Sequence, residues 1–597
     1  MGDVNITTQY HNFDVLIIGS GGAGLSSALS LNENKIHDIA IVSKSSPNLN
    51  HTIEAKGGIN AALGNVDNDN YKYHIYDTIK AGDYISDYDI VELMCKNAPD
   101  AISRLEKIGV NFTKSEDGKI YQRKYGGQTL NFGNGNSSHR VCCVSDKTGY
   151  EIQNKLYHEC LNNNNQFFDY FFVFDLLIKD GKCFGALALD LNSGQFHIFY
   201  AKATIIASGG YNQIYQYNTS NNNFPGDLVS TIINNNLPVQ DMEFIQFHPT
   251  CLYNSNILIS EAARGEGGIL TNSKGKRFME KYAPRYKDLA SRDIIARAMA
   301  TEIYKGNGAG EKKDHLWLDI SHIDPAIIKE RLSETINSVK LFANIDIFSE
   351  KIPVAPAAHY TMGGIPTNIH CQVIDIGNDC REKTINNLFA VGEVASNSAH
   401  GANRLGCNSL LDIIVFGTLT GDFIAKNIKN YNINQLSENY ISKKIEKVTK
   451  IFGKNVKNIS LENIRNKIKR TNQEYVGIFR NKKLLSKALD NFSKLQTELK
   501  EFRISDTSLT FNNELILYFD IKNLLNSSIY TCFSALNREE SRGSHFREDY
   551  KELDDDNFRC HSIVKKDKND KLLYLKRKVR DKFLDEDVII KIKKRQY

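Results

Sequence analysis

Two histidines and several arginines, each close to glycine or proline, are the groups in this sequence best suited to hold an anion. His248 precedes a proline, His359 precedes a pair of glycines by a few residues, and Arg404 precedes a glycine by two. Such positions fall in loops, where functional side chains concentrate. Because an arginine grips a carboxylate through two parallel hydrogen bonds, a molecule with two carboxylates needs a cation at each end. Each residue alone is more often structural, but together they suggest a site for an anionic substrate. The segments concerned are 246–250, 260–268, 289–293, 359–364 and 400–406.

A glycine-rich loop near the N-terminus provides the setting for a nucleotide. Residues 13–18 read as a buried strand, 25–31 as a helix and 39–43 as a second strand, which together predict a βαβ unit. Glycines allow the backbone to approach a pyrophosphate, and a helix N-terminus favours its charge. The second strand runs into Ser43-Lys44 instead of an acidic residue, which argues against an ordinary NAD site. The predicted contacts in the loop are Gly19, Ser20, Gly21, Gly22, Ala23 and Gly24.

His51 follows this loop in a segment that ends with Gly57-Gly58. Together with the loop, the segment resembles the flavoprotein subunits of succinate dehydrogenase and fumarate reductase, and the resemblance extends from residue 13 to about 562. In that family the histidine before the threonine is bonded covalently to FAD. The resemblance therefore implies covalent FAD on His51, whereas the residues alone would also allow His51 to cap a loop.

The anion-binding segments resemble the active site of the same family. The resemblance implies that Arg292 moves the proton, that Glu261 and Arg264 relay it to solvent, and that hydride passes between a substrate carbon and the flavin. Arginine is an awkward proton carrier because its pKa lies above about 12, so a neighbouring carboxylate would ease the exchange. The implied ligands of the substrate carboxylates are His248, Ser260, His359 and Arg404. The implied flavin contacts beyond the loop are Ser43, Lys44, His51, Thr52, Gly57, Gly58, Asp227, Glu393, Ser409 and Leu410.

Several positions depart from the pattern of that family. Lys56 stands where its members have Gln or Glu, Ser260 replaces a Thr, and Tyr125 replaces a Phe. A cation at Lys56 would favour the anionic reduced flavin, so we expect it to raise the flavin reduction potential. The alternative is that Lys56 points away or pairs with Glu54 and leaves the potential unchanged.

The strand-then-glycine pattern recurs at 204–210 and at 388–393. Three such segments predict one α/β nucleotide-binding domain interrupted by an insertion. Runs within 167–200, separated by turn residues, predict β-hairpins. We expect a discontinuous Rossmann-like FAD-binding domain, an inserted capping domain, a helical domain and a C-terminal region. Their expected bounds are 1–243 with 355–420, 244–354, 421–543 and 544–597.

Two features of the C-terminal third have simple structural interpretations. Apolar residues at helical spacing predict an amphipathic helix that packs on its own domain, and the acidic run 554–556 predicts a solvated loop. The residues expected on the apolar face of the helix are Leu484, Ala488, Phe492, Leu495 and Leu499.

Composition limits the classes of partner. A net charge of +5 over 597 residues is too mild to predict nucleic-acid binding. Mean hydropathy is −0.39 and no apolar run reaches about 18 residues, so we expect no transmembrane helix and any membrane association through a partner. Eleven scattered cysteines without a CxxC pair predict no metal or iron–sulfur site on this chain. Residues 1–12 show no targeting segment.

The resemblance implies a succinate dehydrogenase flavoprotein subunit that oxidises succinate to fumarate and passes electrons to an iron–sulfur subunit and on to quinone. It also implies membrane anchor subunits, contacted indirectly, and an assembly factor for flavin attachment. The expected location is the cytoplasmic face of a bacterial inner membrane, with the matrix face of the mitochondrial inner membrane as the alternative. The nearest rival function is fumarate reductase. L-aspartate oxidase, whose members lack the attachment histidine, and a degenerate scaffold flavoprotein are the further rivals.

Overall fold

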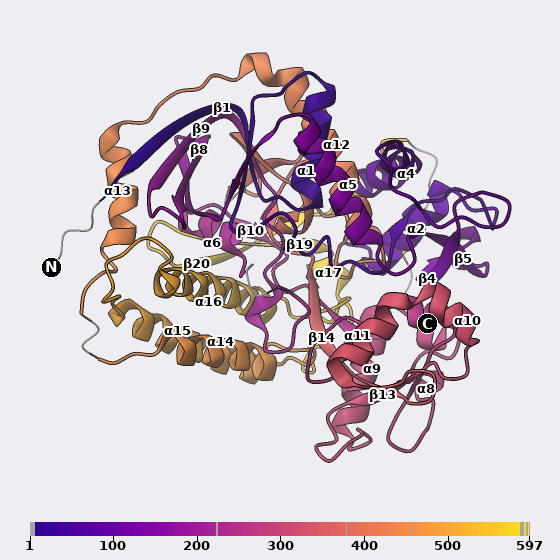
Figure 1. The fold of residues 1–597 in the computed structure, drawn as a ribbon. Coiled ribbons are helices and arrows are strands. Elements are labelled where there is room, and N and C mark those ends of the chain that lie inside the picture. Colours follow the sequence, from indigo (N-terminus) through magenta and orange to yellow (C-terminus); the bar gives the residue numbers. More distant parts are fainter. Residues whose placement is uncertain are drawn as a thin grey trace.

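The structure is a computed structural model that describes residues 6–221, 225–377, 379–454, 457–585, 590–592 and 595. Its largest sheet has eight strands in the order β16-β17-β8-β9-β1-β2-β6, with β7 paired to β8 (Figure 1). β9 pairs in parallel with both β1 and β17, so the three strand-then-glycine segments meet in one sheet. The strands are β1 (Thr8–Ile18), β2 (Ile39–Ser43), β6 (Gln166–Asp169), β7 (Phe171–Lys179), β8 (Lys182–Asp190), β9 (Phe196–Ile206), β16 (Gln372–Ile376) and β17 (Glu382–Ala390).

The predicted βαβ unit and the α/β class are confirmed. β2 covers 39–43 as expected, β1 begins at Thr8 instead of Phe13, and α1 (Gly22–Glu33) begins inside the glycine loop. β1 and β2 pair in parallel, and every residue of β2 is buried, as expected of a strand covered on both faces. Helices α1, α5 (Thr148–Asn162) and α12 (Asn408–Asn427) lie together beside this sheet (Figure 1).

The expected hairpins within 167–200 are partly wrong. β7 and β8 form an antiparallel hairpin that turns at Asp180-Gly181, and β8 also pairs antiparallel with β9. β6, however, pairs in parallel with β2 at the sheet edge. A parallel neighbour requires a crossover, and α5 immediately before β6 provides it.

The insert forms a second unit with its own hydrophobic cluster, seen at the lower right of Figure 1. Its antiparallel sheet has the order β11-β14-β13-β12. Asp146, outside the insert, caps α11 by accepting hydrogen bonds from the backbone N–H groups of Glu334 and Thr335. The elements are β11 (Ile245–Leu252), α7 (Ala262–Gly265), β12 (Ile269–Thr271), α8 (Met279–Tyr282), α9 (Arg292–Tyr304), β13 (Leu316–Asp319), α10 (Pro325–Arg331), α11 (Ser333–Ala343) and β14 (Ile352–Thr361).

A small sheet, with strand order β3-β5-β4, joins the two units. It is assembled from segments of residues 59–142, which also contain three short α-helices. These elements are β3 (Ile59–Asn60), α2 (Tyr71–Ala81), α3 (Tyr88–Lys96), α4 (Ala98–Lys107), β4 (Gln122–Thr129) and β5 (Ser137–Cys142).

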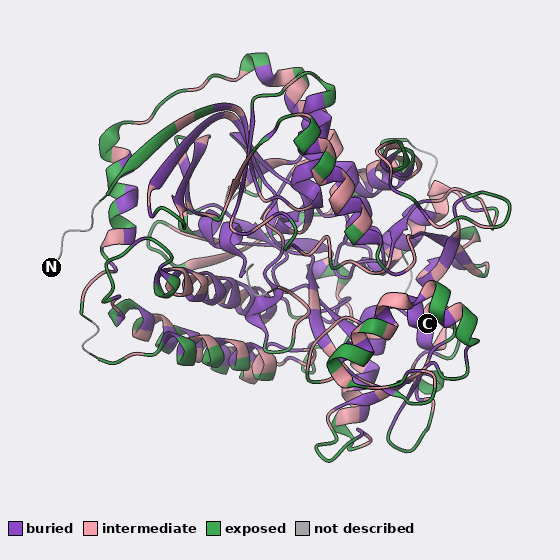
Figure 2. Cartoon of the chain, in the orientation of Figure 1, coloured by how far each residue is buried: buried purple, intermediate pink, exposed green. Residues whose placement is uncertain are grey.

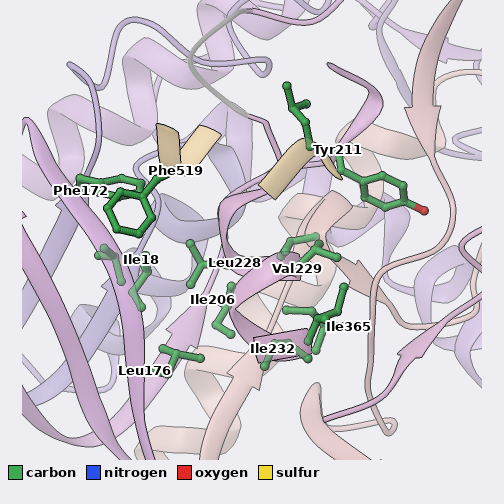
Figure 3. Close-up of a cluster of buried hydrophobic side chains, with 14 of the residues drawn as sticks. Ile18, Phe172, Leu176, Ile206, Tyr211, Leu228, Val229, Ile232, Ile365 and Phe519 are labelled. Carbon is green, nitrogen blue, oxygen red and sulfur yellow. The ribbon is translucent and has the colours of Figure 1, made fainter. Parts of the chain in front are cut away.

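The helical region packs on the main sheet. Figure 2 shows α14 (Leu461–Tyr475) and α15 (Lys482–Glu501) with exposed residues on one side and buried residues on the other. The predicted apolar face of α15 is confirmed except at its start, where Leu485 is buried and Leu484 only half-buried. Helix α16 (Asn513–Asn537) inserts Phe519 against Phe172 of β7, with ring centroids 5.6 Å apart (Figure 3). The remaining helix of this region is α13 (Glu438–Thr449).

The acidic run in the C-terminal region is not a free loop. Asp554 caps the short helix α17 (Asp555–Phe558), and Asp555 forms a 2.7 Å ion pair with Arg542. The following strands, β19 (Cys560–Lys566) and β20 (Leu572–Lys578), form a sheet with β10 (Val239–Gln240). A buried arginine such as Arg542 is stable only when it is paired with a carboxylate, and the sequence pattern did not show that this arginine would be buried.

Helix α12 contains an apolar stretch of the length that the sequence was expected to lack. Among the described residues, the stretch 408–430 is long and apolar enough to cross a membrane, with a mean hydropathy of 1.3. Of its apolar 18-residue window, 61% is nevertheless buried inside the protein, and the helix packs against α1. Burial of this kind is typical of a core helix, whose apolar residues face protein on most sides.

Candidate active site

One cavity of about 510 Å³ joins the glycine loop to the predicted anion-binding residues. Two of the predicted residues do not line it: Gly24, which packs against the backbone of Gly19, and Arg264, whose guanidinium lies 3.6 Å from Glu261. The predicted residues that do line it are Gly19, Ser20, Gly21, Gly22, Ala23, Ser43, Lys44, His51, Thr52, Gly57, Gly58, Asp227, His248, Ser260, Glu261, Arg292, His359, Glu393, Arg404, Ser409 and Leu410.

The glycine loop is shaped for close backbone approach. Gly19 has φ +120°, and a Cβ there would lie 2.2 Å from the carbonyl oxygen of Ala207 at the end of β9. The N–H of Gly22, at the start of α1, donates to the Thr52 hydroxyl at 3.1 Å. The open end of α1 and a cavity of this size fit a dinucleotide such as FAD.

Lys44 lies in this half of the cavity wall, between two carboxylates. Its ammonium is 3.3 Å from Asp227 and 2.6 Å from Asp520. Burial disfavours the charged ammonium, but the two carboxylates outweigh it and raise the pKa of Lys44. Asn523 also donates to Asp227 at 2.7 Å. Asp520 and Asn523 belong to α16, and no sequence signal connected that helix with the cofactor loop.

His51 is placed as a neutral imidazole. Its Nε2 accepts a hydrogen bond from the backbone N–H of Asn221 at 3.1 Å. Burial lowers the pKa of His51 to about 4, so the ring is uncharged at neutral pH. A neutral imidazole keeps the nitrogen lone pair with which it can bond to an electrophilic carbon.

Glu393 lies opposite, after β17. Its carboxylate accepts hydrogen bonds from the backbone N–H and the hydroxyl of Thr361, at 3.0 and 3.2 Å. Burial raises the pKa of Glu393 to about 7 despite these bonds. This carboxyl therefore changes charge close to neutral pH.

Gln246, the first residue of segment 246–250, joins the two arginines of the anion-binding end, a role that was not predicted. Its side-chain oxygen accepts from Arg292 at 3.1 Å and from Arg404 at 3.2 Å. Its amide nitrogen donates to Asn403 at 2.8 Å, which fixes the orientation of the amide. The position of Gln246, two residues before His248 on one strand, was the available signal.

Arg292 also contacts a carboxylate, as its proposed proton exchange requires. Its Nε donates to Glu261 at 2.8 Å, and Arg264 lies 3.6 Å from the same Glu261 oxygen. Burial opposes ionisation, but Arg292 and Arg264 outweigh it and lower the pKa of Glu261. Arg264 is fully buried and donates to the backbone oxygen of Asp288, so it does not itself reach solvent.

The two histidines come from adjacent strands of the insert sheet, β11 and β14. Their rings lie 5.1 Å apart. His359 is hydrogen-bonded to Thr219 at 2.8 Å, and His248 accepts from the backbone N–H of Thr250 at 3.2 Å. Burial, reinforced by Arg292, lowers the pKa of both rings well below its ordinary value. They therefore act as neutral hydrogen-bonding groups.

Positive charge is left unbalanced at this end. Burial and then Arg292 lower the pKa of Arg404 only to about 10, so it stays protonated at neutral pH. Arg264 and Arg292 thus share one ionised carboxylate, Glu261, while Arg404 bonds to the neutral oxygen of Gln246. An anion is the natural partner of this excess.

Lys56 has a hydrogen-bond partner that neither of the two expectations for this residue included. It lines the cavity, and its ammonium donates to Ser338 of α11 at 2.7 Å. Burial lowers the pKa of Lys56 and raises the pKa of Glu54 to about 7. Lys56 therefore links the predicted flavin segment to the insert.

A nucleotide loop and a cationic pocket that share one cavity are the arrangement of a flavin-dependent oxidoreductase acting on a small carboxylate. Residues 14–410 match the FAD binding domain family, and residues 465–597 match the fumarate reductase flavoprotein C-terminal family. The chain belongs to the flavoprotein subunits of the succinate dehydrogenase and fumarate reductase family, and FAD is its cofactor.

Individual relatives span both reactions. The succinate dehydrogenase flavoprotein subunit of Rickettsia conorii is 43% identical over 565 residues, which cover 94% of each chain. The mitochondrial succinate dehydrogenase [ubiquinone] flavoprotein subunit of Oryza sativa is 42% identical over 93% of this chain and 88% of its own. An E. coli quinol fumarate reductase structure superposes with a TM-score of 0.89 at 32% identity, over 97% of this chain and 98% of its own.

Proposed function

We propose that the chain is the flavoprotein subunit of a succinate dehydrogenase and oxidises succinate to fumarate. The observation that carries the proposal is the convergence of Arg292 and Arg404 on one neutral oxygen of Gln246, beside paired neutral histidines. The neutral oxygen of Gln246 does not balance the positive charge of the two arginines. Succinate, which carries a carboxylate at each end, would supply the missing negative charge. The same residues would bind fumarate.

Each residue has a distinct task in this proposal. His248, Ser260, His359 and Arg404 bind the two carboxylates. Arg292 accepts the substrate proton after passing its own to Glu261 across the 2.8 Å contact, and Arg264 stabilises the charge of Glu261. FAD, when bound, would supply the acceptor for the hydride equivalent, and His51 would be the residue that holds it covalently.

Covalent attachment has a direct test. Acid-precipitated native protein should remain yellow and fluorescent, and His51→Ser should release its flavin into the supernatant. Thr52 lines the same part of the cavity, so Thr52→Ser serves as the control that keeps the flavin attached. Free flavin from the acid-treated native protein would contradict attachment.

The proposal extends to partners and location. Electrons leave to an iron–sulfur subunit and reach quinone through membrane anchor subunits, with an assembly factor aiding flavin attachment. The location is the cytoplasmic face of a bacterial inner membrane, or the matrix face of a mitochondrial one. The likeness to bacterial and mitochondrial dehydrogenase subunits supports this.

Fumarate reductase is the second candidate, because the residues serve either direction. The dehydrogenase subunits of Rickettsia and Oryza share more of this sequence than the fumarate reductase flavoprotein subunit of Haemophilus influenzae, which is 33% identical. Purification of the native complex, with identification of its subunits and rates in both directions, tests the choice. Faster fumarate reduction than succinate oxidation would favour the reductase, and no activity in either direction would indicate a scaffold.

A further inference from the structure

Tyr125 is a buried tyrosine in the cavity wall whose hydroxyl has no part in the steps above. It belongs to β4, and its hydroxyl lies 3.2 Å from Ser260 Oγ. The next residue, Gly126, donates its backbone N–H to Glu261 at 2.8 Å. Two adjacent residues of β4, Tyr125 and Gly126, are therefore hydrogen-bonded to two adjacent residues of the site, Ser260 and Glu261.

The hydrogen bonds around Ser260 fix the direction in which its hydroxyl can donate. Ser260 Oγ already accepts from the backbone N–H of Ala262 at 3.2 Å. Within the described part of the chain, the Tyr125 hydroxyl has a hydrogen bond only with Ser260, and a buried phenol O–H is expected to donate to such a partner. A hydroxyl oxygen has two lone pairs and one hydrogen. With both lone pairs engaged, the serine hydrogen is left to point into the cavity that Ser260 lines.

The tyrosine ring is held in a narrow gap, so its hydroxyl cannot move aside. A Cβ on Gly57 would lie 2.9 Å from the tyrosine oxygen, and one on Gly406 would lie 3.2 Å from the ring. The gap therefore lies between the segment that follows His51 and the loop that follows Arg404. Burial raises the pKa of Tyr125 well above its ordinary value, so the phenol keeps its proton at neutral pH.

We propose that Tyr125 is a positioning residue, whose hydroxyl donates to Ser260 and thereby aims the serine hydroxyl at a substrate carboxylate. This role rests on the proposed binding of a dicarboxylate by Ser260. Unlike Arg292, Tyr125 moves no proton. A donor that is already aligned in the free enzyme needs no reorientation when the anion arrives.

The test measures malonate binding to the purified holoprotein through the flavin absorbance. Tyr125→Phe keeps the ring and removes one hydrogen bond, so we expect the malonate Kd and the succinate KM to rise by about five-fold. We expect kcat to change by less than about two-fold, since the residue binds substrate and transition state alike. Tyr215→Phe is the matched control, because it removes a buried tyrosine hydroxyl that bonds to the Val476 backbone and lies outside the cavity wall.

A double-mutant cycle separates this role from simple packing. Ser260→Ala should weaken malonate binding, and adding Tyr125→Phe to it should weaken binding no further. Full additivity, or an unchanged Kd in Tyr125→Phe, would overturn the role of Tyr125 while leaving the proposed function intact. Failure of the wild-type holoprotein to bind malonate would overturn both.

Discussion

The buried cations at the two ends of the cavity differ in their partners. At the cofactor-loop end, Lys44 lies between the carboxylates of Asp227 and Asp520. At the anion-binding end, Arg292 pairs with Glu261, but Arg404 forms no ion pair among the described residues and shares the neutral oxygen of Gln246 with Arg292. A buried charge without a partner is unstable, so the first end is complete in the chain alone and the second is completed by its ligand. The contrast suits a cofactor that stays and a substrate that leaves.

Breaking the anion-binding end should have the largest effect. Arg292→Gln removes the proposed proton carrier, so we expect turnover in both directions to fall by about 10²–10⁴-fold while the flavin spectrum persists. Arg404→Ala is the comparison, since it should chiefly weaken malonate binding. Steady-state rates and malonate titrations distinguish the two. Substantial succinate oxidation by Arg292→Gln would exclude it as the proton carrier.

Breaking the cofactor-loop end should instead affect stability. Lys44→Met leaves the largely buried carboxylates of Asp227 and Asp520 without their cation; loss of one partner of a fully buried pair costs about 3–5 kcal/mol, and the partial exposure of Asp520 lowers that cost. We expect a lower unfolding temperature and less bound flavin, with the malonate Kd of the remaining holoprotein unchanged. Lys482→Met, at an exposed position, is the control that should leave the unfolding temperature unchanged. A large loss of malonate affinity in Lys44→Met would contradict the independence of the two ends.

A pH series should sharpen the contrast with a smaller effect. The pKa of Glu393 is raised to about 7, so its carboxyl gains negative charge in the cavity wall as pH rises through that value. We expect malonate affinity to fall by a few-fold between about pH 6 and pH 8, because the new charge repels a dianion. The fall should disappear in Glu393→Gln. It should remain in Asp412→Asn, whose carboxyl also has a pKa of about 7 but does not line the cavity.

The smallest expected effect belongs to Lys56, which lies in the cavity wall yet donates to Ser338. A cation there should favour the reduced flavin by an amount that corresponds to some tens of millivolts. Spectroelectrochemistry of Lys56→Gln should therefore show a lower flavin potential. Ser338→Ala, which keeps the charge, should shift it less. An unchanged potential in Lys56→Gln would remove Lys56 from the redox chemistry.

Sequence patterns predicted what is local or repeated, and missed what depends on distant partners. The β1–α1–β2 unit was predictable because its strand–glycine–helix pattern is contiguous. Family resemblance, not spacing, brought the histidine and arginine segments together. The carboxylate of Asp520 was not predictable, because an acidic residue on an amphipathic helix usually faces water. Gln246 and Tyr125 were missed as site residues because their roles consist of hydrogen bonds to other side chains.

Asp520 has a consequence for the order in which the protein is made. The strand and loop proposed to hold FAD are synthesised first, within the first 60 residues, yet Asp520, the nearer of the two carboxylates that pair with Lys44, is over 450 residues downstream. At about 5–20 residues per second, a ribosome needs on the order of half a minute to a minute and a half to cover that distance. During this interval Lys44 has at most the more distant carboxylate of Asp227 as its partner. We therefore expect stable loading of flavin to follow translation of α16, not to accompany folding of the N-terminal strands.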